Sequence, residues 1–501
     1  MLKLAQLCRN LPCQIFGDKN IHINGIATHS AKVKNNFLFV ALDGYCTSGK
    51  QYIDDAIKNG SIAIALNDGN LIHKKLDEYH SKITFIKVND PQNFLAQICN
   101  RFYNFPSKKL TLIGITGTNG KTTTSYLIKS IIENTHQKVG LIGTIKYYDG
   151  HRWLPSPNTT PDALYFNEFL SKLVKKKIRY CISEVSSHGL ALNRVAGLNF
   201  KIAIFTNLGN DHLDFHKTKQ AYGKTKLKLF KNLSAKDYAI INLDDKFSKT
   251  IIANTKAKII GYTLKNIQSV NKNLQDIFWA KINKLTPNYT EVIVQSKKTP
   301  SQLIKFPLIG KHNLYNLLAA YACARILKIA HHNIKIGLEK IKPVAGRLQK
   351  IANNCQLNIY IDYAHTADAL KQVILTIKSI TKGKLIVVFG CGGNRDKTKR
   401  PKMGRIATTY ADYVIITSDN PRKENPETII DDIIKGVVKQ NYQRIVDRRQ
   451  AIEHAIKIAE PHDSIIIAGK GHEQYQIIGN NYLPFSDRQV VINALKNINQ
   501  A

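Results

Sequence analysis

Residues 114–123, which read GITGTNGKTT, form a glycine-rich loop between an apolar run and a segment with helical character. The glycines permit a tight turn whose backbone N–H groups point at phosphate oxygens, and the ammonium of Lys121 can neutralise phosphate charge. The hydroxyl of Thr122 can hold Mg²⁺. The usual P-loop has glycine where this chain has Ile115, which indicates a variant of that loop. The spacing predicts a triphosphate-binding site.

Two polar residues follow apolar runs farther along the chain. Glu184 ends one predicted strand and His212 follows the next, so both should project near the glycine-rich loop, where a hard cation takes oxygen ligands. Taken alone, Glu184 also fits a solvated loop, and His212 also fits a hydrogen-bonded core histidine. His212, Asp214 and His216 permit a zinc hypothesis, but no HExxH motif or third-ligand pattern supports it.

The chain divides into three predicted α/β domains that would position these residues. Residues 1–106 alternate short apolar runs with polar turns and predict a small domain followed by a linker. Residues 107–345 alternate strands with helix-length segments, which predicts a central mononucleotide-binding domain with a mainly parallel, helix-covered sheet. Residues 346–501 predict a Rossmann-like doubly wound sheet, with ligands at the loops near Gly390, Ser418 and Gly469. The predicted strands are 110–115, 180–183, 202–206, 238–242, 358–361, 385–389, 413–417 and 465–468, and a helix is predicted at 427–438.

The composition places limits on the class of protein. Of 501 residues, 43% are hydrophobic and 22% are charged, which excludes collagen-like, mucin-like and wholly disordered classes. The chain has no apolar run long enough to span a bilayer and no signal-peptide pattern, so a cytoplasmic protein is expected. The eight cysteines form no CxxC pair, which predicts reduced thiols and no structural zinc.

The charge balance is strongly basic, with 73 Lys and Arg against 36 Asp and Glu and a net charge of +37. Such a balance usually suggests nucleic acid or an anionic membrane as a partner. The lysines are dispersed, however, and no nucleic-acid-binding motif accompanies them. Because Lys, Asn and Ile are all abundant, we interpret the charge as codon bias, although a basic surface would help to recruit an anionic substrate.

Residues 117–122 (GTNGKT) resemble the ATP loop of the Mur ligase family, whose members join amino acids to UDP-N-acetylmuramic acid in peptidoglycan synthesis. The resemblance covers essentially the whole chain, through NTTP at 158–161, SEVSSHG at 183–189, TNL at 206–208, DHLD at 211–214, GKHN at 310–313, GR at 346–347 and DYAHT at 362–366. It implies transfer of the ATP γ-phosphate to a carboxylate, followed by amine attack on the acyl phosphate. The implied ATP contacts are Gly117, Thr118, Asn119, Gly120, Lys121, Thr122, Thr123, Asn313, Asn316, Arg347 and Asp362.

The resemblance also implies a metal site and a modified lysine. Similar ligases carry a lysine carbamylated by CO₂, which turns a cation into a carboxylate-like metal ligand. The family pattern Tyr-x-x-x-Lys matches Tyr222 to Lys226, so Lys226 is expected as N6-carboxylysine, whereas Lys224 and Lys228 fit a basic helix face. The implied Mg²⁺ ligands are Thr122, Glu184, His212 and carbamylated Lys226, and the implied catalytic residues are Lys121, Lys226, His212, Glu184 and His365.

Residues 419–422 (DNPR) look like the motif of the family members that add meso-2,6-diaminopimelate to UDP-N-acetylmuramoyl-L-alanyl-D-glutamate. The guanidinium of Arg422 offers a fork for the distal carboxylate, which L-lysine lacks, and Glu473 suits the distal ammonium. The alternative for this motif is an ordinary Asn-Pro surface turn. The implied diaminopimelate contacts are Arg395, Asp419, Asn420, Pro421, Arg422, Gly469 and Glu473.

The chain departs from the family pattern in each of the three predicted domains. His29 and Ala31 flank Ser30 where relatives usually have Asp-Ser-Arg, Leu192 replaces an often polar residue, and Gln349 stands where Glu is common. Altered affinity for the uridine nucleotide is expected. The implied contacts to the UDP substrate are Thr28, Ser30, Tyr45, Cys46, Thr47, Asn158, Thr159, Thr160, Ser186 and Arg194.

Three other functions would account for some of these features. A lysine-adding ligase and a folylpolyglutamate synthase would share the ATP loop, but Arg422 argues against the first and the muramyl-type first domain against the second. A P-loop ATPase acting on nucleic acid would explain the charge but would need a nucleic-acid module. The expected partners are therefore ATP, Mg²⁺, the UDP-linked dipeptide and diaminopimelate, for a monomer without specific nucleic-acid binding or membrane insertion.

Overall fold

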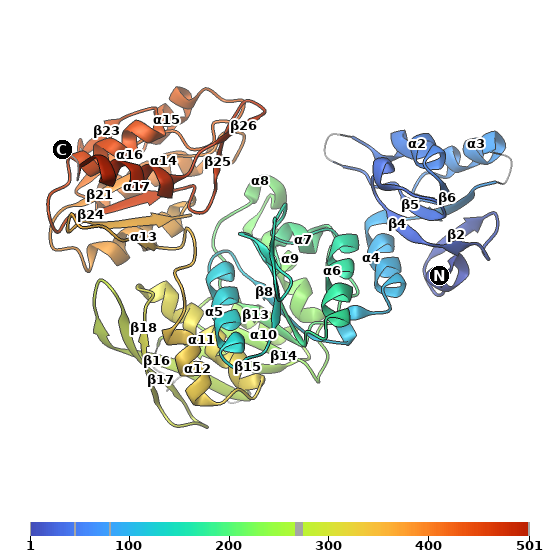
Figure 1. Ribbon diagram of the computed structural model, residues 1–501, viewed down its shortest axis with the longest axis horizontal. Helices are drawn as coiled ribbons and strands as arrows, with labels where there is room; N and C mark the ends of the chain where they lie inside the picture. The colour runs from blue at the N-terminus through green and yellow to red at the C-terminus, as the bar shows by residue number, and fades with distance from the viewer. Residues whose placement is uncertain (1, 45–46, 80–81, 266–273, 499–501) are drawn as a thin grey trace. The chain divides into compact units, whose positions relative to one another are not determined.

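The computed structural model describes residues 2–44, 47–79, 82–265 and 274–498 (Figure 1). The chain forms two compact units, one of Met1–Gly114 with Lys138–Ile202 and one of Ile115–Gln137 with Ala203–Ala501. The predicted domain boundaries after residues 106 and 345 stay predictions. No helix in the described part of the chain has the length and apolar character needed to cross a bilayer.

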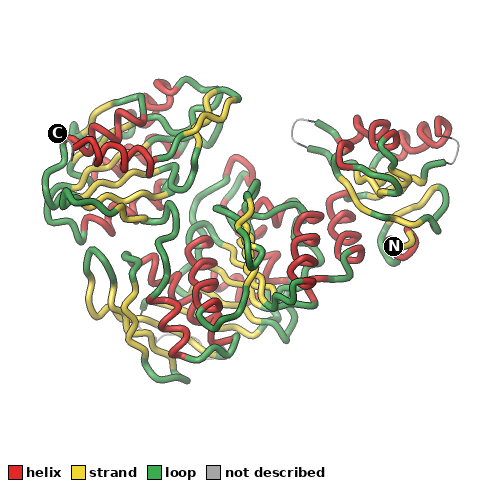
Figure 2. The backbone as a smooth tube through the Cα atoms, in the orientation of Figure 1, coloured by secondary structure: helices red, strands yellow, loops and turns green. Residues whose placement is uncertain are grey.

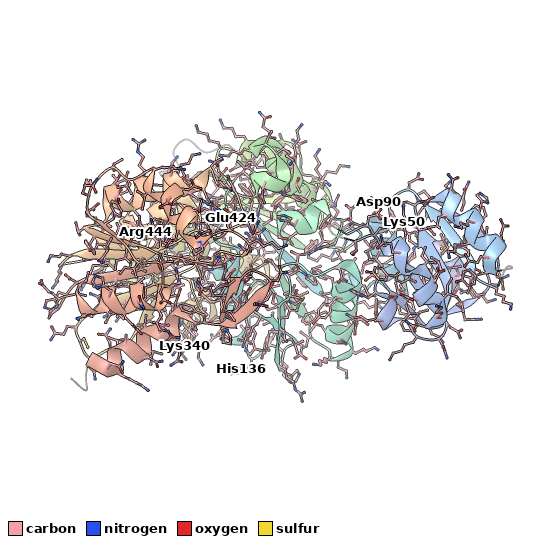
Figure 3. The ribbon with its side chains drawn as sticks, turned by 90° about the horizontal axis from the view of Figure 1, so that it is seen from above. Lys50, Asp90, His136, Lys340, Glu424 and Arg444 are labelled. Atoms are coloured by element: carbon pink, nitrogen blue, oxygen red, sulfur yellow. The ribbon has the colours of Figure 1, made fainter. Side chains whose placement is uncertain are left out.

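The N-terminal segment contains a five-stranded sheet with the order β2-β7-β6-β5-β4. Four strands run parallel, and β2 pairs antiparallel with β7. The strands are β2 (Cys13–Phe16), β4 (Gly25–Ala27), β5 (Phe37–Val40), β6 (Ser61–Leu66) and β7 (Thr84–Val88), and β1 (Leu2–Lys3) pairs with β3 (His22–Ile23). The helices are α1 (Leu4–Cys8), α2 (Ile53–Lys58), α3 (Gly69–Tyr79) and α4 (Pro91–Phe102), with 3₁₀ turns η1 (Ser30–Lys32), η2 (Gly49–Tyr52) and η3 (Pro106–Lys108). Asp90, which is labelled in Figure 3, caps α4 by accepting a hydrogen bond from the Asn93 amide.

An eleven-stranded sheet follows, with the order β11-β10-β9-β12-β8-β13-β14-β15-β16-β17-β18. The pairs β9–β12, β14–β15 and β15–β16 are parallel, whereas β9–β10–β11 and β16–β17–β18 are antiparallel. The strands are β8 (Thr111–Thr116), β9 (Val139–Ile142), β10 (Tyr147–Tyr148), β11 (Trp153–Leu154), β12 (Tyr180–Glu184), β13 (Ile202–Phe205), β14 (Tyr238–Asn242), β15 (Lys258–Thr263), β16 (Asp276–Leu285), β17 (Thr290–Ser296) and β18 (Gln302–Phe306). The helices are α5 (Lys121–Glu133), α6 (Ala163–Lys175), α7 (Ser187–Ala191), α8 (Leu213–His216), α9 (Lys219–Lys231), α10 (Ser248–Ala253), α11 (Lys311–Ile326) and α12 (His331–Glu339).

The C-terminal segment forms a six-stranded sheet with the order β19-β20-β24-β21-β22-β23, in which only β19 is antiparallel to its neighbour. Figure 2 shows the strands of this segment in yellow and its helices in red. Because side chains alternate along a strand, Val387 and Phe389 of β21 pack against α13, α14 and α15, while Ile386 and Val388 pack against α16 and α17. The strands are β19 (Gln349–Ile351), β20 (Asn358–Asp362), β21 (Leu385–Phe389), β22 (Tyr413–Ile416), β23 (Tyr442–Arg444) and β24 (Ser464–Ala468), followed by the hairpin β25 (Tyr475–Ile478) and β26 (Asn481–Pro484). The helices are α13 (Ala367–Lys378), α14 (Lys399–Tyr410), α15 (Pro426–Ile434), α16 (Arg448–Lys457) and α17 (Asp487–Ile498).

The α/β fold with a doubly wound C-terminal sheet is confirmed, but two details differ from prediction. The helix predicted at 427–438 ends at Ile434, because Gly436 turns the chain against the backbone of Pro401 and leaves no room for a side chain. The central sheet is also more mixed than predicted, since β16–β18 form an antiparallel edge.

The side chains of Arg448 and Asp487 form a fully buried ion pair between α16 and α17. The Arg448 Nε lies 2.8 Å from the Asp487 Oδ1, and its Nη2 lies 2.9 Å from Oδ2. We expect Asp487→Ala to lower the free energy of unfolding by about 3–5 kcal/mol, because it leaves a buried guanidinium without its partner. Urea unfolding of the wild type and the variant would measure this difference in the free energy of unfolding. As a control, Glu460→Ala, which breaks the exposed pair with Lys384, should change it by less than about 1 kcal/mol; equal losses would contradict the prediction.

Candidate active site

The glycine-rich loop connects β8 to the N-terminus of α5 (Figure 1). Gly117 has φ 151° and Gly120 has φ 88°, a region of backbone conformation that L side chains rarely adopt. A side chain at Gly117 would also collide with the Thr206 hydroxyl, and one at Gly120 would collide with the Asn316 amide. The loop therefore requires both glycines, as a phosphate-binding turn does.

Lys121 and Thr122 lie on the first turn of α5. The Lys121 ammonium donates hydrogen bonds of 2.9 Å to the carbonyl oxygens of Gly117 and Thr118. The hydroxyl of Thr122 accepts a hydrogen bond of 3.3 Å from Nη2 of Arg347, a residue of the segment that precedes β19. The structure thus brings the predicted lysine, hydroxyl and arginine together at a helix N-terminus, where backbone dipoles favour negative charge.

Lys226 of α9 lies against the same loop. Its side chain is buried, with Nζ donating to the carbonyl oxygen of Gly117 at 2.9 Å and lying 4.4 Å from the centre of the Tyr222 ring. Burial and then the nearby Lys121 lower the pKa of this amine well below its ordinary value, against the opposing effect of Asp211. The neighbouring Lys224 and Lys228 are exposed, so the structure separates Lys226 from both.

A carboxylate that the sequence analysis did not assign, Asp211, lies between the two predicted histidines. Its Oδ2 is 3.5 Å from Nε2 of His212 and 3.9 Å from Nε2 of His365. Burial opposes ionisation of Asp211, but His365, His212, Lys121 and Lys399 together outweigh burial and lower the pKa of this carboxyl. Burial lowers the pKa of His365, whose Nδ1 lies 2.9 Å from the carbonyl oxygen of Tyr363. The signal for Asp211 was its place in the DHLD motif.

The zinc hypothesis at His212, Asp214 and His216 gains no support. Among the residues that the structure describes, no three His, Cys, Asp or Glu side chains form a group that could hold a metal ion. His216 is buried against the Tyr222 ring, at 5.1 Å between ring centres, while His212 is exposed.

Glu184 lies in the first unit, at the buried end of β12. Its Oε1 accepts a hydrogen bond of 3.1 Å from the Thr144 amide, and its Oε2 accepts one of 2.8 Å from the Thr144 hydroxyl. That hydroxyl is 3.1 Å from the hydroxyl of Thr159. Glu184 is therefore a carboxylate held in one orientation, which contradicts the alternative of a solvated loop residue.

The other predicted UDP-substrate residues of this unit gather around Thr160. Its hydroxyl donates to the Glu184 carbonyl oxygen at 2.9 Å and accepts from the Ser186 amide at 2.9 Å. Arg194 donates from Nη1 to the Thr160 carbonyl oxygen at 2.8 Å. The Asn158 carbonyl oxygen accepts a hydrogen bond from the Ser156 hydroxyl. The structure thus joins Thr160, Ser186 and Arg194 in one network.

The predicted UDP contacts of the N-terminal segment are only partly described. Tyr45 and Cys46 lie outside the described residues. Thr28 follows β4, Ser30 begins η1 and accepts from the Asn59 side chain through its carbonyl oxygen at 3.0 Å, and Thr47 is exposed.

Three further predicted ATP contacts, Asn313, Asn316 and Asp362, form two buried groups. Nδ2 of Asn316 donates to Oδ1 of Asn313 at 3.1 Å, and the Thr124 hydroxyl of α5 donates to Oδ1 of Asn316 at 3.3 Å. Asp362 accepts from the Leu348 amide at 2.6 Å, and burial raises its pKa to about 6. These contacts tie α11 to α5 and fix the turn before β19.

Gln349, which departs from the family pattern, has a structural role in that turn. Its Oε1 accepts a hydrogen bond of 3.2 Å from the Gly346 amide. A carboxylate at this position could accept the same bond, so the substitution preserves the turn.

The three C-terminal loops that were predicted to hold ligands, which follow β21, β22 and β24, contact one another. Nδ2 of Asn420 donates to Oε2 of Glu473 at 2.8 Å, and a side chain at Gly469 would press against the buried Asp419 carboxylate. Pro421 is buried and its carbonyl oxygen lies against Gly393. Burial raises the pKa of Glu473, against the opposing effect of Lys470. Lys470 was not predicted as a site residue.

Arg422 lies at the centre of these loops. Its backbone has φ 54°, and its Nη1 donates to the Gly393 carbonyl oxygen at 2.8 Å and to that of Asn420 at 3.4 Å. Burial and then the exposed Arg395 lower its pKa, while Asp419 and Glu473 oppose them. Within the described residues, the guanidinium donates hydrogen bonds only from Nη1. Its Nε and Nη2 can therefore donate to a ligand.

The hairpin β25–β26 holds the Arg422 loop through the backbone. The Arg422 amide donates to the Ile477 carbonyl oxygen at 3.0 Å, and the Gly479 amide donates to the Arg422 carbonyl oxygen at 2.7 Å. Nε2 of Gln476 also donates to the Asp419 carbonyl oxygen at 2.7 Å. The side chains of the hairpin, including Tyr482 and Leu483, are largely exposed.

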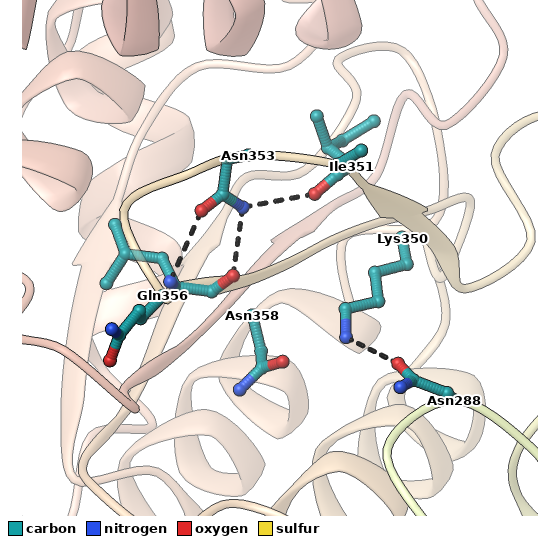
Figure 4. Close-up of a pocket in the computed structure, with 8 residues that line it drawn as sticks. Asn288, Lys350, Ile351, Asn353, Gln356 and Asn358 are labelled. Carbon is teal, nitrogen blue, oxygen red and sulfur yellow. Dashed lines mark hydrogen bonds between the residues drawn. The ribbon is translucent and has the colours of Figure 1, made fainter. Parts of the chain in front are cut away.

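A separate cavity of about 450 Å³ contains none of the predicted site residues (Figure 4). Lys350 donates to the Asn288 side chain there at 2.9 Å, and Asn353 bridges the carbonyl oxygens of Ile351 and Leu357. The cavity is lined by Asn288, Lys350, Ile351, Ala352, Asn353, Gln356, Leu357 and Asn358.

Comparison with protein families gives three matches in chain order. The Mur ligase family, catalytic domain, matches residues 22–103; the Mur ligase middle domain matches residues 115–324; and the Mur ligase, glutamate ligase domain, matches residues 346–471. A solved structure described as UDP-N-acetylmuramoyl-L-alanyl-D-glutamate–2,6-diaminopimelate ligase has a TM-score of 0.67, 30% identity and complete coverage of both chains. A Mycobacterium tuberculosis folylpolyglutamate synthase has a TM-score of 0.62 at 16% identity over 76% of this chain and 92% of its own, which shows only a shared fold.

Two curated relatives are similar over nearly the whole length. The UDP-N-acetylmuramoyl-L-alanyl-D-glutamate–2,6-diaminopimelate ligase of Caldanaerobacter subterraneus subsp. tengcongensis is 42% identical over 98% of both chains. The ligase of the same description from Clostridioides difficile is 41% identical over 98% of both chains. Because the similarity spans all three matched segments, this chain belongs to the Mur ligase family.

Proposed function

We propose that the protein uses ATP to ligate meso-2,6-diaminopimelate to UDP-N-acetylmuramoyl-L-alanyl-D-glutamate in peptidoglycan synthesis. The observation that carries this proposal is the convergence of Arg422, Asp419 and Glu473 at the carboxyl ends of the C-terminal strands. A half-buried guanidinium beside carboxylates suits an amino acid whose distal end bears both a carboxylate and an ammonium. Two relatives that are similar over 98% of this chain are named for this ligase activity.

The reaction proceeds in two steps. A substrate carboxylate attacks the γ-phosphorus of ATP, giving an acyl phosphate and ADP, and the amine of diaminopimelate then attacks the acyl carbon and displaces phosphate. The barrier is largely electrostatic, because two anions must approach each other. Lys121, Arg347 and the N-terminus of α5 supply the positive charge around the phosphate groups.

The residues of the ATP loop fit a magnesium site with a carbamylated lysine. Lys226 is a buried amine beside the loop, and a depressed pKa leaves more of it unprotonated for reaction with CO₂. In the proposed site, Thr122, His212, Glu184 and carbamylated Lys226 would hold Mg²⁺. The metal would neutralise phosphate charge when bound. His365 orients Asp211 beside the loop.

The remaining assignments are part of the same proposal. Residues 1–106 bind the uridine nucleotide, residues 107–345 bind ATP, and residues 346–501 select the amino acid. The network of Thr160, Ser186 and Arg194 positions the UDP-linked dipeptide. The protein acts as a monomer in the cytoplasm, and its high positive charge attracts anionic substrates without specific recognition of nucleic acid.

A ligation assay with a panel of amino acids tests the function. With ATP, Mg²⁺ and the UDP-linked dipeptide, we expect meso-diaminopimelate to be used with kcat/KM at least about 100-fold above L-lysine, because lysine leaves the Arg422 site unpaired. ADP release and the mass of the tripeptide product report the reaction. Preference for L-lysine would identify a lysine-adding ligase, and ATP hydrolysis stimulated only by nucleic acid would overturn the proposal.

A further inference from the structure

A buried ammonium lies behind the loops that carry Arg422 and Glu473. The side chain of Lys470 has no solvent exposure, and its Nζ donates to Oδ1 of Asn420 at 2.8 Å and to Oε2 of Glu473 at 3.1 Å. Asn420 closes the triangle by donating from Nδ2 to the same oxygen of Glu473. Three side chains from two loops therefore fix one another.

The backbone around Lys470 is built to hold it in place. Gly469 and Gly471 flank it with φ 117° and φ 55°, and a side chain at Gly471 would collide with Tyr363. The Gly469 amide donates to the Asp362 carbonyl oxygen at 3.1 Å, and the Glu473 amide donates to that of Lys470 at 3.0 Å. The lysine is thus directed inward from a turn with little freedom.

The amide of Asn420 is largely used within the protein. Its Oδ1 accepts from Lys470 and, at 3.0 Å, from the Ile477 amide, while its Nδ2 is engaged with Glu473. An amide oxygen has two lone pairs, so Oδ1 is saturated. Asn420 therefore links Lys470 to strand β25, because it contacts both Lys470 and the Ile477 amide. Strand β25 in turn accepts a hydrogen bond from the Arg422 amide.

We infer that Lys470 is a positioning residue for amino-acid selection: it does not touch the ligand but holds Glu473 and Asn420 in the geometry that the distal end of the amino acid requires. This inference rests on the proposed function. A buried carboxylate that lost its lysine partner would be free to turn away, and its spacing from the Arg422 fork would no longer be fixed.

The variant Lys470→Met removes the ammonium while keeping an unbranched side chain. We expect KM for diaminopimelate to rise about 30-fold or more, because a buried, hydrogen-bonded charge pair has lost one partner. The KM values for ATP and the UDP-linked dipeptide should stay within about 3-fold, and so should kcat at saturating amino acid. The matched control is Lys402→Met, at an exposed lysine of α14, which should leave all four constants unchanged. An unchanged KM for diaminopimelate in Lys470→Met would overturn the inference.

A double-mutant cycle separates positioning from direct binding. Because Lys470 is inferred to hold Glu473 as well as Asn420, Lys470→Met should weaken binding of the amino acid much less in the Glu473→Gln background than in the wild type. In the double variant both charges are removed, so no unpaired carboxylate is buried. The double variant can therefore still be measured if Lys470→Met alone folds poorly. Losses that multiply would mean that Lys470 acts independently of Glu473, which contradicts the inference. Wild-type selectivity in the same assay tests the proposed function; if the wild type uses another amino acid, the same cycle is run with that one.

Discussion

Lys226→Ala should reduce ligase activity by at least two to three orders of magnitude, about the loss seen when a charge-stabilising group is removed from an active site. Lys226 is buried beside the Gly117 carbonyl oxygen, and the proposed carbamate would place an anionic ligand there. Formate, acetate or propionate should restore part of the activity, since a small carboxylate can occupy the volume that the side chain leaves. Initial rates of ADP release, with and without each acid, measure both effects.

The matched control is Lys224→Ala, because Lys224 lies on the same helix but is exposed. It should retain nearly full activity and should not respond to added carboxylates. Wild-type activity should also fall when CO₂ and bicarbonate are removed from the buffer. Rescue of Lys224→Ala instead, or full activity in Lys226→Ala, would reject Lys226 as the modified residue.

Arg422→Ala should raise the diaminopimelate concentration needed for half-maximal rate by a factor of hundreds or more, corresponding to about 3–5 kcal/mol of binding. The truncation would leave the distal carboxylate of the ligand desolvated and unpaired. Arg422→Lys should recover only part of this loss, because an ammonium lacks the planar fork. Steady-state kinetics with each substrate varied in turn would show the effect confined to the amino acid.

Arg444→Ala provides the control for Arg422→Ala. Arg444, which is labelled in Figure 3, belongs to the same C-terminal sheet, but it pairs with Glu427 and Asp431. Its loss should change kinetic constants little. If Arg422→Ala used diaminopimelate as well as the wild type does, the assignment of the amino acid would be wrong.

Some features of the site could be predicted because they follow from regular periodicity. The run at 385–389 is uninterrupted by polar residues, as expected for a strand buried on both faces, and β21 has those bounds. In α9, Tyr222, Lys226, Leu229 and Phe230 recur at helical spacing and are all buried. The resemblance to the family singles out Lys226, and the same helical repeat places this lysine on the apolar face of α9.

Other features depend on contacts between distant segments and left no local signal. Lys470 meets Asn420 across 50 residues, and nothing in the sequence around it distinguishes a buried lysine from a surface one. Asp211 is close to His365, which lies far along the chain in the loop that follows β20 of the C-terminal sheet. The strands β16–β18 mix apolar residues with polar ones, since buried positions alternate with more exposed ones along β17 and β18 and the second half of β16 is exposed. They therefore lack the apolar runs by which the other strands were recognised.

The backbone attachment of the Arg422 loop to the hairpin β25–β26 has an evolutionary consequence. The hydrogen bonds between Arg422, Ile477 and Gly479 involve only main-chain atoms, so they do not depend on the side chains of the hairpin. The exposed face of the hairpin can accumulate substitutions freely, whereas its length and register are constrained. A single insertion or deletion there would shift the arginine relative to its pocket. Changes of amino-acid preference could therefore arise from indels in a peripheral hairpin, with every residue of the pocket retained.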